Sequence, residues 1–243
     1  MPIGVIVNSS AVFVGGILGA LLGKRIPERL RTSLPLAFGA ASMSMGINYI
    51  LKLKILPVVV LALIVGTAIG ELIYFEKGIE KVATAVRGPV ERLFGGKKAS
   101  AQEGAEDKSA FMEKFVAIFI LFCASGTGIF GALNEGMTGD YSVLVTKSIL
   151  DFFTSGIFAA TLGILVATIA LPQFAVLFAL FLSASVILPM TTPDMIANFT
   201  ACGGMIMLAT GLRISGIKSF PIANMLPALV LVMPLTYLWV TYI

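Results

Sequence analysis

The most constraining feature of this chain is the length of its uninterrupted apolar runs. They measure about 20 residues, the length that crosses the hydrocarbon core of a bilayer as an α-helix. Only 12% of the 243 residues are charged, about half the fraction found in soluble domains. Because so little charge cannot cover a water-soluble globule, the sequence predicts an all-α polytopic membrane protein. It excludes a soluble enzyme, a nucleic-acid-binding protein and a secreted module.

The apolar runs divide the chain into eight predicted membrane spans. Their approximate limits are 3–23, 34–51, 55–75, 115–134, 143–168, 171–190, 198–214 and 221–243. The division between the fifth and sixth spans rests on Leu171-Pro172, where Gln173 is the only strongly polar residue. Three regions follow: a three-span membrane repeat in 1–75, a polar segment in 76–114, and five spans in 115–243.

The basic residues predict the orientation of these spans. With the N-terminus outside the cytoplasm, fourteen of the 17 Lys and Arg residues fall on the cytoplasmic side, and the other three are Lys52, Lys54 and Lys147. The positive-inside rule therefore places both termini of this multi-pass protein outside the cytoplasm. No basic residue precedes Lys24, so we expect a retained first span rather than a cleaved signal peptide.

The segment 76–114 is the only long polar stretch. Apolar residues recur every three or four positions to about residue 94, which predicts an amphipathic helix along the cytoplasmic interface, bent near Gly88-Pro89. Residues 95–109 are small or charged without an apolar anchor, and they predict a disordered linker.

Two sets of small residues and prolines recur with nearly the same spacing. They are Gly39, Gly46 and Pro57 in the second and third spans, and Gly204, Gly211 and Pro221 in the seventh and eighth. In the predicted threading, spans one to three and six to eight run in opposite directions. This arrangement predicts an inverted repeat, as in many alternating-access carriers. The alternative is a chance recurrence of residues that allow close helix packing.

The strongest candidate site lies in the fifth predicted span. Asp151 is an ionisable residue within an apolar run, and Lys147 lies one helical turn before it. Such residues usually have a partner or a function. One interpretation is an ion pair that permits insertion. The other is a substrate or coupling-ion site that includes Ser148 and Thr154, with Asp151 as a carrier of a coupling proton. Glu135 and Asp140 are expected in a solvated outer loop.

Other polar and glycine-rich positions extend the list of candidates. Asn8 and Asn224 predict either interhelical hydrogen bonds or site residues. Two glycine clusters, one with Ser125 and Thr127 and one with Gly203 and Gly204, predict either locally unwound helices that expose backbone groups to a ligand, or close helix packing.

The chain lacks the residue types of most catalytic and metal sites. It has no histidine, and its two cysteines, Cys123 and Cys202, lie within apolar runs. Ser-His or Cys-His nucleophile pairs and imidazole metal ligands are therefore excluded. We expect no enzyme activity, no cofactor and no metal site.

Several motifs resemble those of one bacterial family. They are Gly4-Val5-Ile6-Val7-Asn8, Gly15-Gly16-Ile17-Leu18-Gly19, Gly70-Glu71, Gly139-Asp140-Tyr141-Ser142, Lys147-Ser148-Ile149-Leu150-Asp151, Gly203-Gly204 and Asn224-Met225-Leu226-Pro227. In this order they resemble the YqgA/YdfK-like membrane proteins, over nearly the whole chain except the linker. The resemblance implies a prokaryotic inner-membrane protein but no substrate. The glycine-rich stretch Ser125–Gly128 departs from the family pattern.

These features favour a secondary transporter of a small solute or ion, acting by alternating access. The alternative is a membrane scaffold, an assembly subunit or a lipid-organising protein. The expected partners are the lipid bilayer and an unknown solute or ion, with no nucleic acid. A homodimer through Gly15, Gly19 and Gly23 is also predicted, because this spacing allows close helix packing, although packing within one chain would use the same pattern.

Overall fold

The computed structural model describes residues 1–22, 25, 27–79, 81, 115, 118–119 and 121–243. Within these residues the structure is helical, without strands. The helices are α1 (Ile3–Leu22), α2 (Glu28–Ile50), α3 (Leu56–Leu72), α6 (Gly126–Thr138), α7 (Ser142–Leu162), α8 (Leu165–Thr168), α9 (Ala170–Ile187), α10 (Pro193–Ile214), α11 (Ile222–Met225) and α12 (Pro227–Tyr242), with a short 3₁₀ helix at Leu188–Met190.

Five helical segments are long and apolar enough to cross a membrane. They are Ile3–Leu22, Ser142–Leu162, Leu165–Met190, Pro193–Ile214 and Ile222–Tyr242, and Leu56–Leu72 is a shorter apolar helix. Large apolar side chains such as Leu21, Leu171 and Val230 are mostly exposed on the surface. A bilayer solvates such side chains, whereas water does not. The chain is therefore a helical membrane protein.

The predicted boundary between the fifth and sixth spans is wrong by several residues. α7 ends at Leu162, and Gly163 adopts a left-handed φ of 69°. Glycine adopts this conformation without steric cost, so the chain turns here. Pro172 lies in the first turn of α9, where proline is tolerated because no helical hydrogen bond is lost. The pair Leu171-Pro172 therefore belongs to the second apolar segment and does not separate two spans.

Two other predicted spans begin too late. α2 begins at Glu28 rather than near residue 34, and Pro35 lies within it. α10 begins at Pro193, and Thr192 accepts a hydrogen bond from the Met195 amide at 3.3 Å as the N-cap. Apolar composition alone misses such starts, because capping residues and charged first turns precede the apolar stretch.

The fourth predicted span is interrupted. Residues 121–123 are helical, but Ser125 has extended backbone angles and α6 begins at Gly126. The Ser125 hydroxyl caps α6 by accepting a hydrogen bond from the Gly128 amide at 3.1 Å. At the other end, Gly139 terminates α6 with a left-handed φ of 75°. The N-terminus of α6 therefore lies within the fourth predicted span, at its glycine-rich stretch.

α10 shows no such interruption, so the predicted unwinding at Gly203 and Gly204 is wrong. The helix is continuous from Pro193 to Ile214. A Cβ on Gly203 would collide with the Phe130 ring, and one on Gly204 would lie 2.7 Å from the Gly46 carbonyl oxygen. These glycines serve close packing, the second of the two interpretations.

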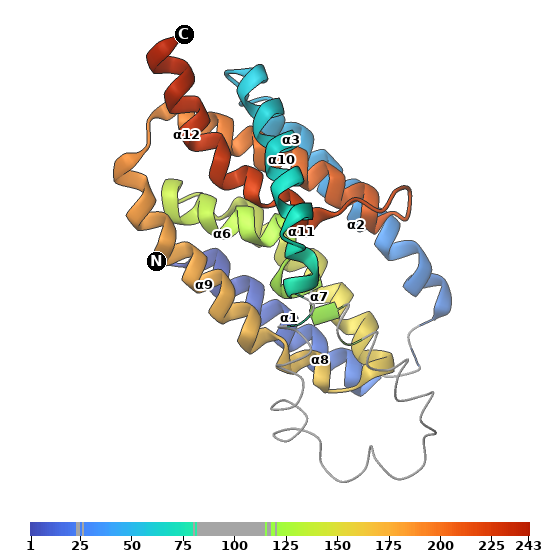
Figure 1. Cartoon of the computed structure of the whole chain (residues 1–243). Helices are drawn as coiled ribbons and strands as arrows, with labels where there is room; N and C mark the ends of the chain where they lie inside the picture. Colours follow the sequence, from blue (N-terminus) through green and yellow to red (C-terminus); the bar gives the residue numbers. More distant parts are fainter. Residues whose placement is uncertain (23–24, 26, 80, 82–114, 116–117, 120) are drawn as a thin grey trace.

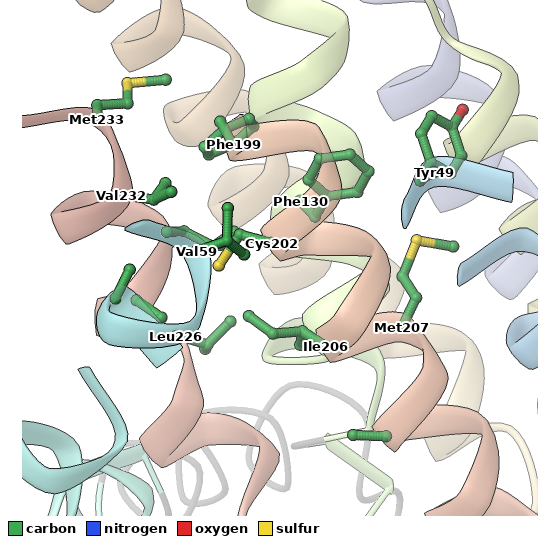
Figure 2. Packing of buried hydrophobic residues seen from close by; sticks show 14 of the residues in the cluster. Tyr49, Val59, Phe130, Phe199, Cys202, Ile206, Met207, Leu226, Val232 and Met233 are labelled. Atoms are coloured by element: carbon green, nitrogen blue, oxygen red, sulfur yellow. The ribbon is translucent and has the colours of Figure 1, made fainter. Parts of the chain in front are cut away.

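The helices form two groups that α6 connects (Figure 1). In one group α1 packs against α7, α8 and α9. In the other group α2 packs against α10, and α3 packs against α10, α11 and α12. The largest hydrophobic core lies in this second group and includes the buried side chains Phe130, Phe199, Cys202, Ile206 and Met207 (Figure 2). Because Phe130 belongs to α6, this helix contributes to the core of the second group while contacting α7 and α9 of the first.

Close contacts fix the relative directions of the paired helices. α1 and α7 run parallel, since Gly4 faces Leu144 and Gly19 faces Gly156. α2 and α10 run antiparallel, and α3 runs antiparallel to the α11–α12 segment. Gly15 and Gly19 thus pack within the monomer, and Gly23 lies outside the described residues. The predicted homodimer stays a prediction, without support from these two glycines.

The polar segment 76–114 lies almost wholly outside the described residues, and so do the predicted bend at Gly88-Pro89 and the linker 95–109. Its beginning is described. The Glu76 amide donates to Asn224 Oδ1 at 2.8 Å, and the Glu76 carboxylate pairs with Arg213 at 3.1 Å. These contacts attach the chain after α3 to the end of α10 and to α11.

Candidate functional site

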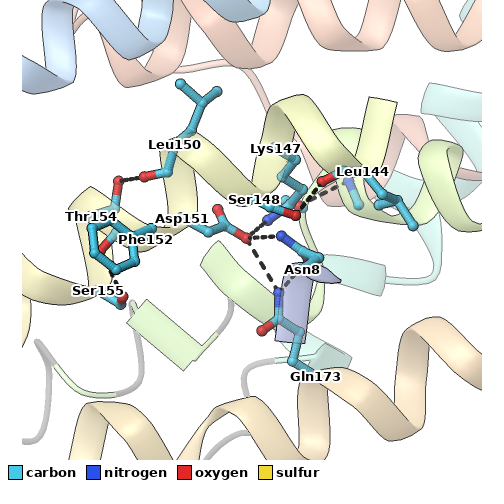
Figure 3. Close-up of polar contacts among 12 residues, drawn as sticks. Asn8, Leu144, Lys147, Ser148, Leu150, Asp151, Phe152, Thr154, Ser155 and Gln173 are labelled. Atoms are coloured by element: carbon cyan, nitrogen blue, oxygen red, sulfur yellow. Dashed lines mark hydrogen bonds and ion pairs between the residues drawn. The ribbon is translucent and has the colours of Figure 1, made fainter. Parts of the chain in front are cut away.

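Asp151 lies in α7 at the centre of a buried polar cluster (Figure 3). Its Oδ2 atom accepts hydrogen bonds from Asn8 Nδ2 at 2.8 Å, from Gln173 Nε2 at 3.3 Å, and from Lys147 Nζ. Gln173 Nε2 also donates to Asn8 Oδ1 at 2.7 Å. One carboxylate oxygen therefore joins side chains from α1, α7 and α9. We call these four residues the Asp151 cluster.

The helix packing explains how these residues meet. Lys147 and Asp151 lie one turn apart on the same face of α7. Gly15 and Gly19 bring α1 close to α7, which carries Asn8 to the Asp151 side chain. α9 lies on the other side of α1 and supplies Gln173. The ion pair follows from the four-residue spacing within α7, whereas tertiary packing brings the amides of Asn8 and Gln173 to Asp151.

The Asp151 cluster is removed from solvent. Asn8 and Gln173 are fully buried, and Lys147 and Asp151 retain only 4% and 7% exposure. Burying one unpaired charge costs several kcal/mol, so the ammonium and the carboxylate require each other here. The Gln173 Oε1 atom is buried and has no hydrogen-bond partner. The cluster thus contains one hydrogen-bond acceptor that its protein neighbours do not satisfy.

The stem of Lys147 lies beside the interruption before α6. Its Nζ atom is 5.8 Å from the centre of the Phe122 ring. A Cβ on Gly128 would lie 3.2 Å from Lys147 Cε, so the glycine leaves room for the lysine stem. Ser125 caps α6 at this place and Thr127 is buried in its first turn. The partial positive end of α6 and the ammonium therefore face the same region.

Several predicted site residues lie outside the Asp151 cluster. The Ser148 hydroxyl donates to the Leu144 carbonyl oxygen at 2.6 Å, and the Thr154 hydroxyl donates to the Leu150 carbonyl oxygen at 2.8 Å. Both hydroxyls are thus bonded within their own helix. Asn224 accepts from Glu76 on another part of the protein. Gly203 and Gly204 pack within the larger core. Of the predicted residues, the structure brings together Asp151, Lys147 and Asn8.

The sequence predicts Glu135 in a solvated outer loop, and this prediction is wrong. α6 extends to Thr138, which places Glu135 in its last turn at 3% exposure. Its Oε1 atom accepts a hydrogen bond from the Gly4 amide at 2.8 Å. Gly4 lies in the first turn of α1, where free amides and the helix dipole favour a carboxylate. Glu135 therefore caps α1 from a neighbouring helix.

Asp140 is partly exposed between α6 and α7. Burial opposes its ionisation, but hydrogen bonds from Ser142 and the charge of Lys52 outweigh that effect, so its pKa lies below the usual value. The Ser142 amide donates to Asp140 Oδ1 at 2.9 Å. This residue orders the connection between two helices and lies apart from the Asp151 cluster.

Gln173 is the functional candidate that sequence reasoning missed. The apolar pattern places this residue at a break between two predicted spans, whereas it lies within α9 and is fully buried. The available signal was an uncharged amide inside the apolar segment Leu165–Met190. A polar side chain in such a segment usually faces other helices.

Comparisons with known proteins identify relatives of this chain. The model of a family described as "Protein of unknown function (DUF554)" matches residues 3–237. The chain is 51% identical to the uncharacterized protein YqgA of Escherichia coli, over all of this chain and 99% of that protein. It is 30% identical to the uncharacterized membrane protein YdfK of Bacillus subtilis, over 94% of this chain and 93% of that protein. No solved structure matches. The chain therefore belongs to this DUF554 family of bacterial YqgA- and YdfK-like proteins.

Proposed function

We propose that this protein is a secondary transporter of a small solute or ion in a prokaryotic inner membrane, acting by alternating access. The observation that carries the proposal is the Asp151 cluster. A buried carboxylate receives side-chain hydrogen bonds from three helices, and ionisable groups inside membrane segments mark substrate or ion pathways in many transporters. The protein is not proposed to be an enzyme.

An eight-span threading with both termini outside is part of this proposal. Helices that the threading makes parallel, α1 with α7 and α6 with α9, have parallel contacts. Helices that it makes antiparallel, α2 with α10, have antiparallel contacts. Lys147 is buried against Asp151 rather than placed in a loop. Removing it from the count of outside basic residues leaves only Lys52 and Lys54 there, which strengthens the charge asymmetry.

The contacts between α2 and α10 support the inverted repeat. The motif comparison equates Gly39 with Gly204, and Gly46 with Gly211. In the structure Gly39 faces Gly211 and Gly46 faces Gly204, with virtual Cβ positions 2.6–2.7 Å from the opposing carbonyl oxygens in all four cases. Reciprocal contacts of this kind are the property of an interface around a two-fold axis.

The offset of 165 positions that equates Gly39 with Gly204 also relates two residues of the Asp151 cluster. Gln173 donates to Asn8, and the two residues are 165 positions apart, the separation that also relates Ser42 to its partner Met207. Residues that contact their own repeat equivalents lie on the axis between the repeats. Asn8 and Gln173 are therefore proposed as equivalent residues of the two repeats, which meet at Asp151. Binding between inverted repeats near mid-membrane is the usual arrangement in secondary transporters.

In the proposed mechanism the two groups of helices move relative to each other. α6 contacts both groups, and the direct contact between α2 and α7 is small. Phe38 and Phe153 form a ring contact across it at 6.4 Å between centroids. Few contacts other than those of α6 join the groups. Rocking of the groups would shift α6 against α7, and this shift would open the side of Lys147 that faces Gly128 to alternate sides of the membrane.

A ligand screen tests this proposal. The purified protein would be heated with ions, carboxylates, amino acids or nucleosides, because a ligand at 100 times its dissociation constant stabilises the folded state by about 2.7 kcal/mol. The proposal expects a hit that is absent in Asp151→Asn and retained in Thr154→Val, since the Thr154 hydroxyl bonds within its own helix. A hit unaffected by Asp151→Asn would contradict the proposed site.

A further inference from the structure

A single layer of apolar side chains lies next to the Asp151 cluster. Its four members are fully buried, pack together and come from four helices: Val5 in α1, Ala132 in α6, Leu144 in α7 and Leu177 in α9. We call them the apolar layer. Its α1 member precedes Asn8 by three positions, and its α7 member precedes Lys147 by three. In α9, which runs antiparallel to α1, its member follows Gln173 by four. The layer therefore lies one helical turn from the cluster, toward the side of the membrane where α1 begins.

Leu144 fills the space between α1 and α6 in this layer. A Cβ on Gly4 of α1 would lie 2.8 Å from Leu144 Cβ, and a Cβ on Gly131 of α6 would lie 2.7 Å from Leu144 Cδ2. The leucine is thus held between glycines of two neighbouring helices. One turn further along α7, the Ser148 hydroxyl donates to the Leu144 carbonyl oxygen at 2.6 Å (Figure 3). Leu144 therefore separates the region of Ser148 from the side where α1 begins.

A larger group of apolar side chains closes the opposite side of the Asp151 cluster. Val12, one turn beyond Asn8 in α1, belongs to this group together with Phe122 and Ile169. The group includes further aromatic rings and residues of α7 and α8. The four buried members of the apolar layer include no aromatic ring. The barrier toward the side where α1 begins is therefore the thinner of the two.

α6 is bounded in a way that lets it move as a short unit against α7. It has 13 residues, begins at the interruption at Ser125 and ends at Gly139, whose φ is 75°. Because Gly131 of α6 contacts Leu144 of α7, a shift of α6 changes the packing of the apolar layer directly.

Glu135 lies on the outer rim of the layer, one turn beyond Ala132 in α6. Its Oε1 atom accepts from the Gly4 amide, whereas its Oε2 atom is buried and receives no hydrogen bond from the described residues. A buried polar atom without a partner costs free energy. Water that enters between α1 and α6 would satisfy this oxygen, so opening on this side removes an unfavourable feature of the closed structure.

We propose that the apolar layer is the outer gate of the transport pathway and that Leu144 is its main barrier. The inference rests on the proposed transporter function and deepens it, because it assigns the part of the pathway that closes toward the outside. In this structure the gate is closed. Movement of α6 away from α7 separates Gly131 from Leu144 and admits water, which a narrow apolar constriction otherwise excludes.

Thiol labelling from the two sides of the membrane tests the gate. Both native cysteines are replaced by alanine, Ser148→Cys supplies the single thiol, and a charged, membrane-impermeant reagent is applied to vesicles of either orientation. Leu144→Ala should raise the labelling rate from the outer side about tenfold, because truncating a buried leucine destabilises the closed gate. The rate from the inner side should not rise.

Leu162→Ala is the matched control. Leu162 is also a buried leucine of α7, at 5% exposure, but it belongs to the apolar group on the opposite side of the Asp151 cluster. This variant should leave the outer rate unchanged. Cooperative unfolding checks the folding of each variant. Val5→Ala, a smaller truncation in the same layer, takes the place of Leu144→Ala if that variant does not fold.

An outer rate that Leu144→Ala leaves unchanged in a folded protein would overturn the gate. Equal rises from both sides, or the same outer rise in Leu162→Ala, would also overturn it, because general loosening of the helix packing gives these results. If Ser148→Cys reacts from both sides at rates that Leu144→Ala does not change, the gate is wrong and alternating access remains. If Ser148→Cys reacts from neither side even with Leu144→Ala, alternating access itself is contradicted.

Discussion

At the scale of single residues, the described part of the protein buries one ion pair, Lys147 with Asp151, and one further carboxyl residue, Glu135, at the start of α1. Lys147 and Asp151 are both more than nine-tenths buried, and two fully buried amides complete the contacts of one carboxylate oxygen. Elsewhere in the described residues the second ion pair, Glu76 with Arg213, remains partly exposed. Stability and function should therefore respond most strongly to changes at Asp151.

Asp151→Asn should destabilise the protein by about 3–5 kcal/mol, because it leaves the buried Lys147 without a counter-ion. Adding Lys147→Met should recover most of this loss by making the cluster neutral. Thr154→Val, one turn away in α7, should cost about 1 kcal/mol or less. Thermal unfolding in detergent measures all three. A double variant no more stable than Asp151→Asn would contradict the proposed cost of leaving the Lys147 ammonium unpaired.

Asp140 gives a prediction about pH. Its pKa in the folded protein lies below the usual value of an aspartate side chain, so the folded state favours the ionised form. This contribution to stability is present above about pH 4 and is lost as the pH falls through the lowered pKa. Asp140→Asn should lower Tm modestly at neutral pH and flatten its dependence on pH below about 4. Identical acid profiles for both proteins would contradict this assignment.

At the scale of helices, sequence reasoning succeeded where the signal was composition. It predicted membrane helices from the apolar runs, and five helical segments of the described residues are long and apolar enough to cross a bilayer. It misplaced ends that depend on single residues: the turn at Gly163, the Thr192 cap and the charged start of α2 at Glu28. These features lie outside the apolar periodicity, so a count of apolar residues does not detect them.

The interface between α2 and α10 yields a matched pair of variants. A Cβ on Gly46 would lie 2.6 Å from the Gly204 carbonyl oxygen, whereas a Cβ on Gly156 would lie 3.5 Å from its nearest neighbour, the Gly15 carbonyl oxygen. Gly46→Ala should therefore lower Tm by several degrees, because the helices must separate. Gly156→Ala should be neutral or stabilising, because alanine favours a helix. Similar effects of both substitutions would show that the α2–α10 contact is not tight.

At the scale of the whole molecule, the sequence predicted the kind of protein and part of its site. Lys147 and Asp151 could be paired from helical spacing alone. Asn8 is among the predicted site residues only as one of several polar residues that could equally form interhelical hydrogen bonds. Gln173 is not among the predicted site residues. Their position depends on α1 packing between α7 and α9, which local sequence does not encode. Glu135 was misjudged for the same reason, since its partner Gly4 is 131 positions away.

The central claim is that the region of the Asp151 cluster opens to both sides of the membrane in turn. Ser148 follows Lys147 in α7 and is buried at 4% exposure, whereas Ile149 is 58% exposed on the apolar surface. With Cys123 and Cys202 replaced by alanine, Ser148→Cys and Ile149→Cys each provide one thiol. A charged, membrane-impermeant thiol reagent can then be applied to vesicles of either orientation.

The account predicts that Ser148→Cys reacts from both sides, that a ligand hit changes the ratio of the two rates, and that Ile149→Cys reacts from neither. Folding of each variant is checked by cooperative unfolding. A folded Ser148→Cys protein that reacts from neither side, or from one side only under every condition, would contradict alternating access. If the protein is instead a closely packed membrane scaffold without a water-filled pathway, Ser148→Cys should react from neither side.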